Sequence, residues 1–394
     1  MRIVISGYTY TRQNLFDVFE SYPERERLYF ILPSNWTAKH GKVVFKPFTR
    51  KGFHIYHSPA LFTHSQYPVI GGLLKGWMPF FVIRLAWVRF TKGADILFTT
   101  GEPNVLSTLY NAFWAKLFGM KHVFHYWENI PYEEKDRGLK YQLKQWIIRA
   151  TLALSDGAIC GMYKAERILK SFGSDIKIGT FLHAGFDAQR FRPGIHHEDV
   201  SQQYGLAGSK VFLFIGALGK RKGIHIALRA LARMKGEYPV KFLIVGSGEY
   251  ESELRVLVSA LGLQSEVIFV PWITENEKLP ALYNAADVFL YPSIPLDGWE
   301  EQFGYSIAEA SLCGVPVIST RTGSIDEVLI DQRTGIMVPP NDENALYEAM
   351  VALVENPEKA YQYGVNGREY IAAHYSNEVI SKKMFSLFHD VIKQ

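Results

Sequence analysis

Short apolar runs alternate with helical patterns along most of the chain. In the first half, five apolar runs bounded by polar or glycine-containing segments predict buried strands, at residues 2–6, 28–32, 96–99, 122–125 and 158–160. The segments between them, including 105–118 and 140–154, predict helices. This alternation is typical of a parallel sheet covered by helices on both faces. The pattern weakens between about residues 45 and 65, where aromatic residues, histidines and prolines indicate loops.

The alternation pauses at GFDAQRFRPG, residues 185–194, and then restarts. The runs VFLFIG, KFLIVG, VIFVP, VFLYP and PVIST predict a second set of strands, with helices over 224–234, 252–261 and 278–285. A chain of 394 residues is too long for one ordinary core, so we expect two α/β domains in series. Ligands of such folds usually bind at the carboxyl ends of the strands.

The composition, 48% apolar and 21% charged without a low-complexity tract, fits a globular enzyme. The chain has only two cysteines, Cys160 and Cys313, both in apolar surroundings. This argues against a disulfide framework and favours a reducing compartment. The opening apolar run is too short for a signal peptide, and we expect it to be a buried strand.

Charge divides the chain into a basic and an acidic half. Residues 1–190 hold 25 Lys and Arg against 14 Asp and Glu, a net charge of +11, whereas residues 191–394 hold 18 against 25, a net charge of −7. A basic half favours an anionic partner such as a phosphorylated substrate or an anionic membrane. Nucleic acid is the weaker interpretation, because the basic residues are scattered and no recognised binding motif accompanies them.

The most apolar window covers residues 69–90, and Lys75, Arg84 and Arg89 interrupt it. No window therefore has the length of uninterrupted apolar sequence that a spanning helix needs. Two interpretations of residues 69–90 stay open. The segment either lies in a membrane interface, with its aromatic residues against the acyl chains, or forms a core helix of the first domain.

A basic loop follows the first predicted strand of the second domain, in FIGALGKRKGIHI. The strand ends at Gly216, and Lys220, Arg221 and Lys222 lead into a helix. Backbone amides at a helix start together with cationic side chains can hold phosphate, which we favour over a mere surface charge run. The spacing is not that of a Walker A loop.

A second glycine loop, Gly246-Ser247-Gly248, begins like a dinucleotide-binding fingerprint. Glu251 occupies the position of the third glycine, and no acidic ribose ligand follows at the usual distance. A nicotinamide cofactor is therefore disfavoured, and a tight turn before a helix is the simpler interpretation.

The stretch WEEQFGYSIAEA, residues 299–310, places Glu301 and Glu309 eight residues apart. In one continuous helix they would lie about 12 Å apart along the axis, beyond the carboxylate separation of about 5–9.5 Å found in glycoside hydrolases. Gly304 and the preceding Asp297-Gly298 favour a loop, with a helix from about Tyr305. The two carboxylates then flank a helix N-terminus whose amides suit phosphate. A nucleotide diphosphate sugar has the matching order of groups: sugar, phosphates, ribose and base.

With these motifs the chain resembles the retaining glycosyltransferases of family 4, most closely over about residues 154–357. The most specific motif, E-x-F-G-x-x-x-x-E, is met by Glu301, Phe303, Gly304 and Glu309. The linker at 185–193, the Lys222-Gly223 pair, the Gly246 loop and the run CGVPVIST are similar as well.

The resemblance implies an α/β GT-B fold, with two Rossmann-like domains facing across a cleft. Residues 1–190 with about 377–394 would form the acceptor-binding domain, and residues 191–376 the domain that binds the nucleotide sugar. The C-terminal helix would cross back to the first domain.

The resemblance also implies roles for the two carboxylates and the helix start. Glu309 would bind the donor ribose, and Glu301 would hold donor sugar hydroxyls. The amides of Phe303, Gly304, Tyr305 and Ser306 would face the sugar and the phosphates.

Further positions would complete the donor site. Arg221 and Lys222 would neutralise the diphosphate leaving group, and Arg221 or Lys220 would replace the arginine that the family usually has directly after Gly216. Gly7, after the first strand, would let the backbone approach the phosphate, and Gly216 and Gly246 would line the donor.

His125 ends a predicted strand, HVFH at residues 122–125. It occupies the place where the family often has a histidine near the donor sugar. Two interpretations stay open: a general base, or a hydrogen-bonded core residue.

The chemistry that the resemblance implies is transfer of a hexose-type sugar with retention of anomeric configuration. No Asp-x-Asp motif occurs, so we expect neither a divalent metal nor a cofactor. A sugar-nucleotide epimerase or hydrolase on the same fold, and a non-catalytic module that binds nucleotide sugar for a partner, remain alternatives.

The acceptor would be a hydroxyl of a lipid-linked molecule or polysaccharide, met in the cytoplasm or at the inner face of the cell membrane. We expect it to contact residues 8–12 and 39–67. Neither the base, the sugar, the linkage nor the oligomeric state follows from the sequence.

Overall fold

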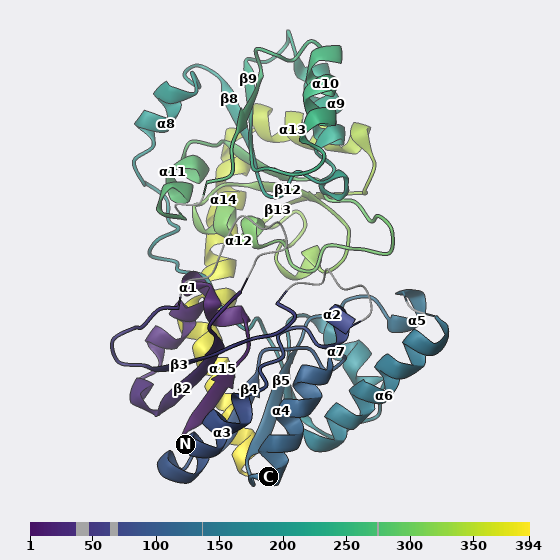
Figure 1. The fold of residues 1–394 in the computed structure, drawn as a ribbon. Coiled ribbons are helices and arrows are strands. Elements are labelled where there is room, and N and C mark those ends of the chain that lie inside the picture. Colours follow the sequence, from purple (N-terminus) through teal and green to yellow (C-terminus); the bar gives the residue numbers. More distant parts are fainter. Residues whose placement is uncertain (37–46, 64–69, 136, 274–275) are drawn as a thin grey trace. The chain divides into compact units, whose positions relative to one another are not determined.

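The computed structural model describes the chain except for residues 37–46, 64–69, 136 and 274–275. The chain divides into two compact units (Figure 1). Unit 1 comprises Met1–Gly185 and Asn377–Gln394, and unit 2 comprises Phe186–Ser376. The sequence predicts the first boundary at residue 190, whereas the chain enters unit 2 at Phe186. There the amide of Phe186 donates to the carbonyl of Tyr375 at 2.9 Å, within unit 2.

Unit 1 contains a parallel sheet with the order β3-β2-β1-β4-β5-β6-β7. Its strands are β1 (Ile3–Ser6), β2 (Leu28–Pro33), β3 (His54–Ser58), β4 (Ile96–Thr99), β5 (Lys121–Tyr126), β6 (Gly157–Cys160) and β7 (Lys177–Thr180). Its helices are η1 (Thr9–Thr11), α1 (Gln13–Phe16), η2 (Asp17–Ser21), η3 (Arg25–Arg27), α2 (Ile70–Leu73), α3 (Phe81–Lys92), α4 (Leu106–Leu117), α5 (Tyr132–Lys135), α6 (Gly138–Leu154), α7 (Tyr163–Lys170) and α15 (Asn377–Ile392).

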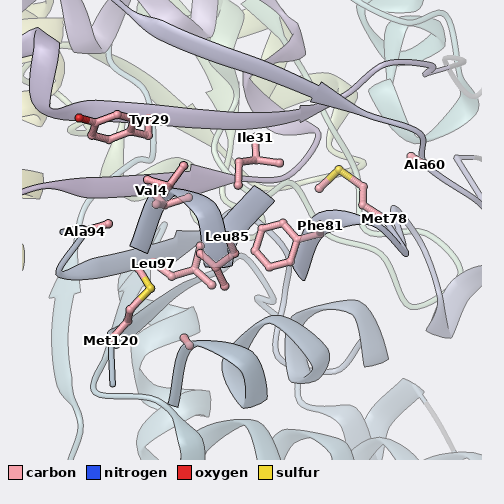
Figure 2. Packing of buried hydrophobic residues seen from close by; sticks show 12 residues of the cluster. Val4, Tyr29, Ile31, Ala60, Met78, Phe81, Leu85, Ala94, Leu97 and Met120 are labelled. Atoms are coloured by element: carbon pink, nitrogen blue, oxygen red, sulfur yellow. The ribbon is translucent and has the colours of Figure 1, made fainter. Parts of the chain in front are cut away.

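The two faces of this sheet are covered by different helices. Val4 and Leu97 belong to a buried cluster with Phe81 and Leu85 of α3 (Figure 2). The next residue along β4, Phe98, points to the other face, and its ring lies 5.5 Å from that of Phe388 on α15. Successive strand residues face opposite sides, so β4 needs apolar residues throughout, which explains its run ILFT.

The strand β3 corrects the prediction of loops between about residues 45 and 65. Residues 54–58, HIYHS, pair in parallel with β2 at the edge of the sheet. An edge strand has one neighbour and is only partly buried, so it can carry polar residues and gives no apolar run. Residues 45–46 and 64–65 of this stretch lie outside the described residues.

Unit 2 contains a second parallel sheet with the order β10-β9-β8-β11-β12-β13. Its strands are β8 (Lys210–Ile215), β9 (Val240–Val245), β10 (Val267–Val270), β11 (Val288–Tyr291), β12 (Val317–Thr320) and β13 (Gly335–Val338). Its helices are α8 (Glu198–Gln203), η4 (Lys220–Lys222), α9 (Ile224–Met234), α10 (Glu251–Ala260), η5 (Asn276–Lys278), α11 (Leu279–Asn284), α12 (Tyr305–Leu312), η6 (Ile325–Glu327), α13 (Glu343–Glu355) and α14 (Pro357–Tyr375).

The apolar window at 69–90 contains all of α2 and most of α3, and Val69 itself lies outside the described residues. Phe81, Leu85 and Val88 of α3 are buried in the core, as the core-helix interpretation requires. The opposite side of α3 is exposed and also apolar, with Ile83 and Phe90 in solvent. Among the helices described, none has the length and apolar character needed to cross a membrane.

Candidate functional site

The loops that follow β8 and β9 are packed against each other. The amide of Gly216 donates to the carbonyl of Val245 at 3.0 Å, and the amide of Leu218 donates to Ser247 at 3.0 Å. A Cβ atom on Gly246 would overlap the carbonyl oxygen of Gly216. Only glycine allows this approach, so Gly216 and Gly246 form one continuous backbone surface at the carboxyl end of the sheet.

The basic loop after Gly216 places Arg221 and Lys222 in different surroundings. The side chain of Lys222 is buried, whereas that of Arg221 is exposed. The carbonyl of Arg221 accepts from the amide of Ile294 at 2.8 Å, which ties this loop to the segment that follows β11. The loop therefore presents Arg221 to solvent and places the side chain of Lys222 inside the protein.

Lys222 meets Glu301 in a buried ion pair. The Nζ of Lys222 donates to Glu301 Oε2 and, at 2.5 Å, to the hydroxyl of Tyr291. The Tyr291 hydroxyl donates to the same Oε2 at 2.8 Å, and the Ser293 hydroxyl reaches it at 3.2 Å. Burial lowers the pKa of Lys222 and the Glu301 charge opposes this change. Three donors thus hold one carboxylate oxygen in a fixed position.

Arg221 lies over an aromatic ring from the opening of the WEEQFG stretch. Its guanidinium is 4.2 Å from the ring centre of Trp299, which is two residues before Glu301. This cation–π contact orients the exposed guanidinium beside the buried pair. An exposed, oriented arginine can bind a phosphate without first breaking a buried ion pair.

The helix α12 begins directly after the Phe303-Gly304 step, as the sequence predicts. Phe303 is buried, and Gly304 has a left-handed backbone with φ of +80°. This turn directs the chain into Tyr305 and Ser306, the first residues of the helix. Within the part of the chain that the structure describes, no side chain caps the N-terminus of α12 by a hydrogen bond. The geometry suits an anion at this helix end.

Glu309 is one turn into α12 and has its own partners. The hydroxyl of Tyr283 on α11 donates to Glu309 Oε2 at 2.7 Å. Burial raises the pKa of Glu309 to about 7, and the Tyr283 hydrogen bond and the Arg190 charge oppose the rise. Near neutral pH the carboxylate therefore sits close to the midpoint of its titration.

Two candidate residues, Gly7 and His125, belong to unit 1. Gly7 follows β1, and a Cβ atom there would overlap the hydroxyl oxygen of Thr100. His125 on β5 is buried, and its Nε2 lies 3.1 Å from Nδ1 of His183. Burial and the neighbouring His183 lower the pKa of His125 well below its usual value, and burial lowers that of His183 to about 4.

Unit 2 brings together most of the predicted site. Arg221, Lys222 and Glu301 form one group, and Glu309 lies on the helix that starts beside it. His125 is a hydrogen-bonded buried histidine, as one of its two interpretations requires.

The partners of these side chains do not follow from the sequence motifs. They are Tyr291 and Ser293 beside Glu301, Tyr283 beside Glu309, and His183 beside His125. Tyr291 and Ser293 end the run VFLYPS, so their place at the carboxyl end of a strand was a usable signal. Tyr283 and His183 carry no such signal, because only the tertiary fold brings them close.

Two further hydroxyls lie beside Glu301. Gly323 packs its Cα against the backbone of Glu301, and the amide of Ser324 donates to the Glu301 carbonyl at 3.0 Å. The hydroxyls of Thr322 and Ser324 are buried and have no hydrogen-bond partner within the described part of the chain. Buried hydroxyls of this kind are suited to bind a polar ligand.

Across the described ranges, no three His, Cys, Asp or Glu side chains are grouped so that they could hold a metal ion.

Comparisons with known proteins show what this chain is similar to. Residues 197–370 match the model of the glycosyl transferases group 1. A GDP-mannose-dependent alpha-(1-6)-phosphatidylinositol monomannoside mannosyltransferase of Mycolicibacterium smegmatis is 34% identical over 214 residues, which cover 53% of this chain and 55% of that protein. The D-rhamnosyltransferase WbpZ of Pseudomonas aeruginosa is 36% identical over 160 residues, 40% of either chain. The match thus spans about half or less of the length of these curated relatives.

Solved structures resemble the chain over its whole length. Anabaena HepE in complex with UDP has a TM-score of 0.74 at 18% identity, covering 99% of this chain and 100% of that one. Sucrose-phosphate synthase from Thermosynechococcus elongatus has a TM-score of 0.75 at 22% identity, covering 100% and 99%. At these identities the likeness shows the fold. The predicted α/β GT-B fold with two Rossmann-like units is confirmed.

Proposed function

We propose a function from the premise that this chain belongs to the glycosyl transferases group 1 family, whose model its unit 2 matches. The chain transfers a hexose-type sugar from a nucleotide diphosphate sugar to an acceptor hydroxyl, with retention of anomeric configuration and without a metal. The observation that carries this proposal is the buried Lys222–Glu301 pair between the exposed Arg221 and the N-terminus of α12.

The donor would be held through complementary charges and hydrogen bonds. Arg221 and the amides at the start of α12 would bind the diphosphate, which carries negative charge. Glu301, fixed by its three donors, would accept hydrogen bonds from sugar hydroxyls. Glu309 would accept the two ribose hydroxyls, and its charge state at neutral pH would make that contact sensitive to pH.

In the reaction, the bond between the anomeric carbon and the diphosphate oxygen breaks, and the electron pair leaves with the diphosphate. The acceptor oxygen forms its bond on the same face of the sugar ring, and its proton passes to the leaving phosphate oxygen. Arg221 and the helix N-terminus would stabilise the negative charge that develops on the diphosphate. Glu301 is not needed as a nucleophile, which agrees with the three donors that already hold its Oε2.

The acceptor would be lipid-linked or a polysaccharide, met at the cytoplasmic face of the membrane. Support comes from the mycobacterial relative, which acts on a phosphatidylinositol mannoside. That relative depends on GDP-mannose, so GDP-mannose is the first donor to test. Unit 1 would bind the acceptor.

The first experiment is a thermal-shift panel with UDP, GDP, ADP, dTDP and CDP, with magnesium or with EDTA. We expect one diphosphate to stabilise the protein equally in both conditions, and Glu309→Ala to lose the shift. Glu369→Ala, an exposed glutamate on α14, is the matched control. No shift with any diphosphate would contradict the donor site.

Radiolabelled sugar from the matching donor then separates the three activities. Transfer to a membrane extract supports the proposal. Free sugar or an epimerised nucleotide sugar without acceptor indicates the hydrolase or epimerase. Binding without turnover indicates a non-catalytic module.

A further inference from the structure

Three neighbouring helices of unit 1 have an outer surface that is both apolar and basic. We call it the α3-α4-α6 surface. Helices α3, α4 and α6 cover the same face of the sheet, and α4 lies between the other two (Figure 1). The ring of Phe90 on α3 lies 5.6 Å from that of Phe118, which directly follows α4, and α4 packs along α6.

Large apolar side chains gather on this surface. Of the fifteen large hydrophobic side chains that are exposed among the described residues, nine lie on these helices or at the start of α3. They are Phe80, Ile83, Trp87, Phe90, Phe113, Leu117, Leu139, Leu143 and Trp146. Single exposed hydrophobic residues are normal on proteins, but a contiguous group of this kind marks an interaction surface.

The spacing shows that these residues form defined helix faces. On α3, positions 80, 83, 87 and 90 recur every three or four residues, and so do positions 139, 143 and 146 on α6. The inner face of α3 is already filled by Phe81, Leu85 and Val88 in the core. The helix is thus apolar on two sides, although only one side has a protein partner. Ile83 is 63% exposed, Phe90 71% and Trp146 60%.

Every charged residue on the three helices is basic. They carry seven Lys and Arg and no Asp or Glu: Arg84, Arg89, Lys92, Lys116, Lys140, Lys144 and Arg149. Glu133 and Glu134, both exposed on the adjoining helix α5, limit the surface beyond α6. A protein partner of ordinary composition would not select a surface of one sign only. An anionic lipid layer does, because its headgroups meet the cations and its acyl chains meet the aromatic residues.

We propose that the α3-α4-α6 surface binds an anionic lipid bilayer, with its aromatic and aliphatic side chains in the interface and its exposed Lys and Arg at the headgroups. The inference extends the membrane location in the proposed function, on which it rests, by naming the surface that makes the contact. On this proposal both interpretations of α3 apply to the same helix: one side packs in the core and the other lies on lipid.

Vesicle co-sedimentation of the full chain tests this proposal. With vesicles of phosphatidylcholine containing 30% phosphatidylglycerol as the probe, we expect the protein to pellet at low salt and to be partly released by 0.5 M NaCl. With pure phosphatidylcholine, it should stay largely in solution. Failure to pellet with the anionic vesicles at low salt overturns the proposal.

Paired variants locate the contact. Ile83→Gln with Phe90→Gln should lower the partition coefficient at least about tenfold, because two apolar side chains leave the interface. The matched control is Val256→Gln with Tyr361→Gln, two exposed apolar residues on helices of unit 2, which should change nothing. Equal losses in both pairs would overturn the assignment to this surface.

Charge is tested in the same way. Lys116→Gln with Lys140→Gln should weaken binding about fivefold per charge removed. Lys382→Gln with Lys393→Gln changes the net charge equally but lies in the α15 region, on the other face of the sheet, and should have little effect. If both pairs weaken binding equally, only the net charge matters and the surface assignment is wrong.

Nucleotide binding keeps this result separate from the proposed function. The thermal shift with the matching diphosphate should be unchanged in all surface variants, which also shows that they are folded. Vesicle binding without any nucleotide shift would reject the donor site and leave the lipid surface standing. Sedimentation equilibrium gives the remaining outcome: a dimer that Ile83→Gln with Phe90→Gln converts to a monomer makes the surface a contact between copies and overturns the lipid proposal.

Discussion

The carboxyl end of the unit 2 sheet holds a buried ion pair, whereas the carboxyl end of the unit 1 sheet holds two imidazoles, that of His125 buried and that of His183 partly buried. In unit 2, Lys222 and Glu301 compensate each other inside the protein. In unit 1, burial keeps the pKa of both His125 and His183 low, so the pair is neutral at pH 7. The two parallel sheets thus offer different chemistry at their carboxyl ends. The sheet of unit 2 offers fixed charges, and the sheet of unit 1 offers neutral hydrogen-bond donors and acceptors.

This difference matches the two halves of the proposed glycosyl transfer. The donor carries a diphosphate and its departure creates charge, which needs preorganised cations and dipoles. The acceptor brings a neutral hydroxyl, which neutral imidazoles can contact without a charge penalty. We therefore expect the charged site of unit 2 and the neutral imidazole pair of unit 1 to respond differently to substitution and to pH.

The largest effect should come from breaking the ion pair. Lys222→Met leaves the Glu301 carboxylate buried without its cation, so we expect the free energy of unfolding to fall by about 3 kcal/mol. Glycosyl transfer should fall at least about 10²-fold, because the carboxylate loses its position. Urea denaturation of the full chain and initial rates measure the two effects.

The control variants separate charge balance from simple loss of contacts. Lys222→Met combined with Glu301→Gln should recover much of the lost stability but no activity. Arg221→Met, at the exposed cation, should cost less than about 1 kcal/mol in stability while still lowering the rate. Equal destabilisation by Arg221→Met and Lys222→Met would remove the distinction between the two cations.

A smaller effect is expected one turn into α12. Glu309→Ala should raise the Kd of the nucleotide sugar by about 10²-fold, the typical worth of hydrogen bonds to a charged group. Tyr283→Phe removes only the hydroxyl that orients Glu309 and should raise Kd about fivefold. Isothermal titration calorimetry measures both, with Glu369→Ala as the control; a larger effect of Tyr283→Phe would argue that Glu309 does not touch the ribose.

Donor binding should also depend on pH through Glu309. Because burial raises its pKa to about 7, the carboxylate gains its proton as the pH falls through neutrality. If ribose hydroxyls donate to the charged form, affinity for the nucleotide sugar should fall about tenfold between pH 8 and pH 6. Glu309→Gln should flatten this profile, and a wild-type profile that is already flat would count against the ribose contact.

The smallest effect is expected at the His125–His183 pair of unit 1. His183→Asn removes the neighbour that holds His125, and we expect turnover to fall about fivefold, the worth of one neutral hydrogen bond. The Kd of the nucleotide sugar should stay unchanged. A parallel change in Kd would show that the imidazole pair serves the donor instead.

The two units also differ in how much of their structure could be predicted from the sequence. In unit 2 the strands are continuous apolar runs, and the residues of the site follow them in loops with glycine punctuation and a specific motif. It could therefore be predicted that a helix starts at Tyr305 and that Lys222 and Glu301 belong to one site. The direct pairing of Lys222 with Glu301 could not, since the two are 79 residues apart and meet only through the order of β8 and β11.

In unit 1 the informative residues are scattered and have no motif. His183 lies 58 residues after His125, so no local spacing connects them. The strand β3 escaped prediction because an edge strand can be polar. The outer side of α3 shows the opposite problem: its sequence is as apolar as the core side, so only the structure tells which side has a protein partner.

The helix α15 has a consequence for the order in which the chain is made. Its residues follow the whole of unit 2 in the sequence, yet they pack on unit 1, where the ring of Phe385 stacks on Tyr22 at 3.5 Å. During synthesis, unit 2 leaves the ribosome as one contiguous segment, whereas one face of the unit 1 sheet, including Phe98, stays uncovered until residue 388 has been added. Unit 1 must therefore wait for translation to pass through unit 2 before its core can close, and for that interval it presents an apolar face on which chaperones can act.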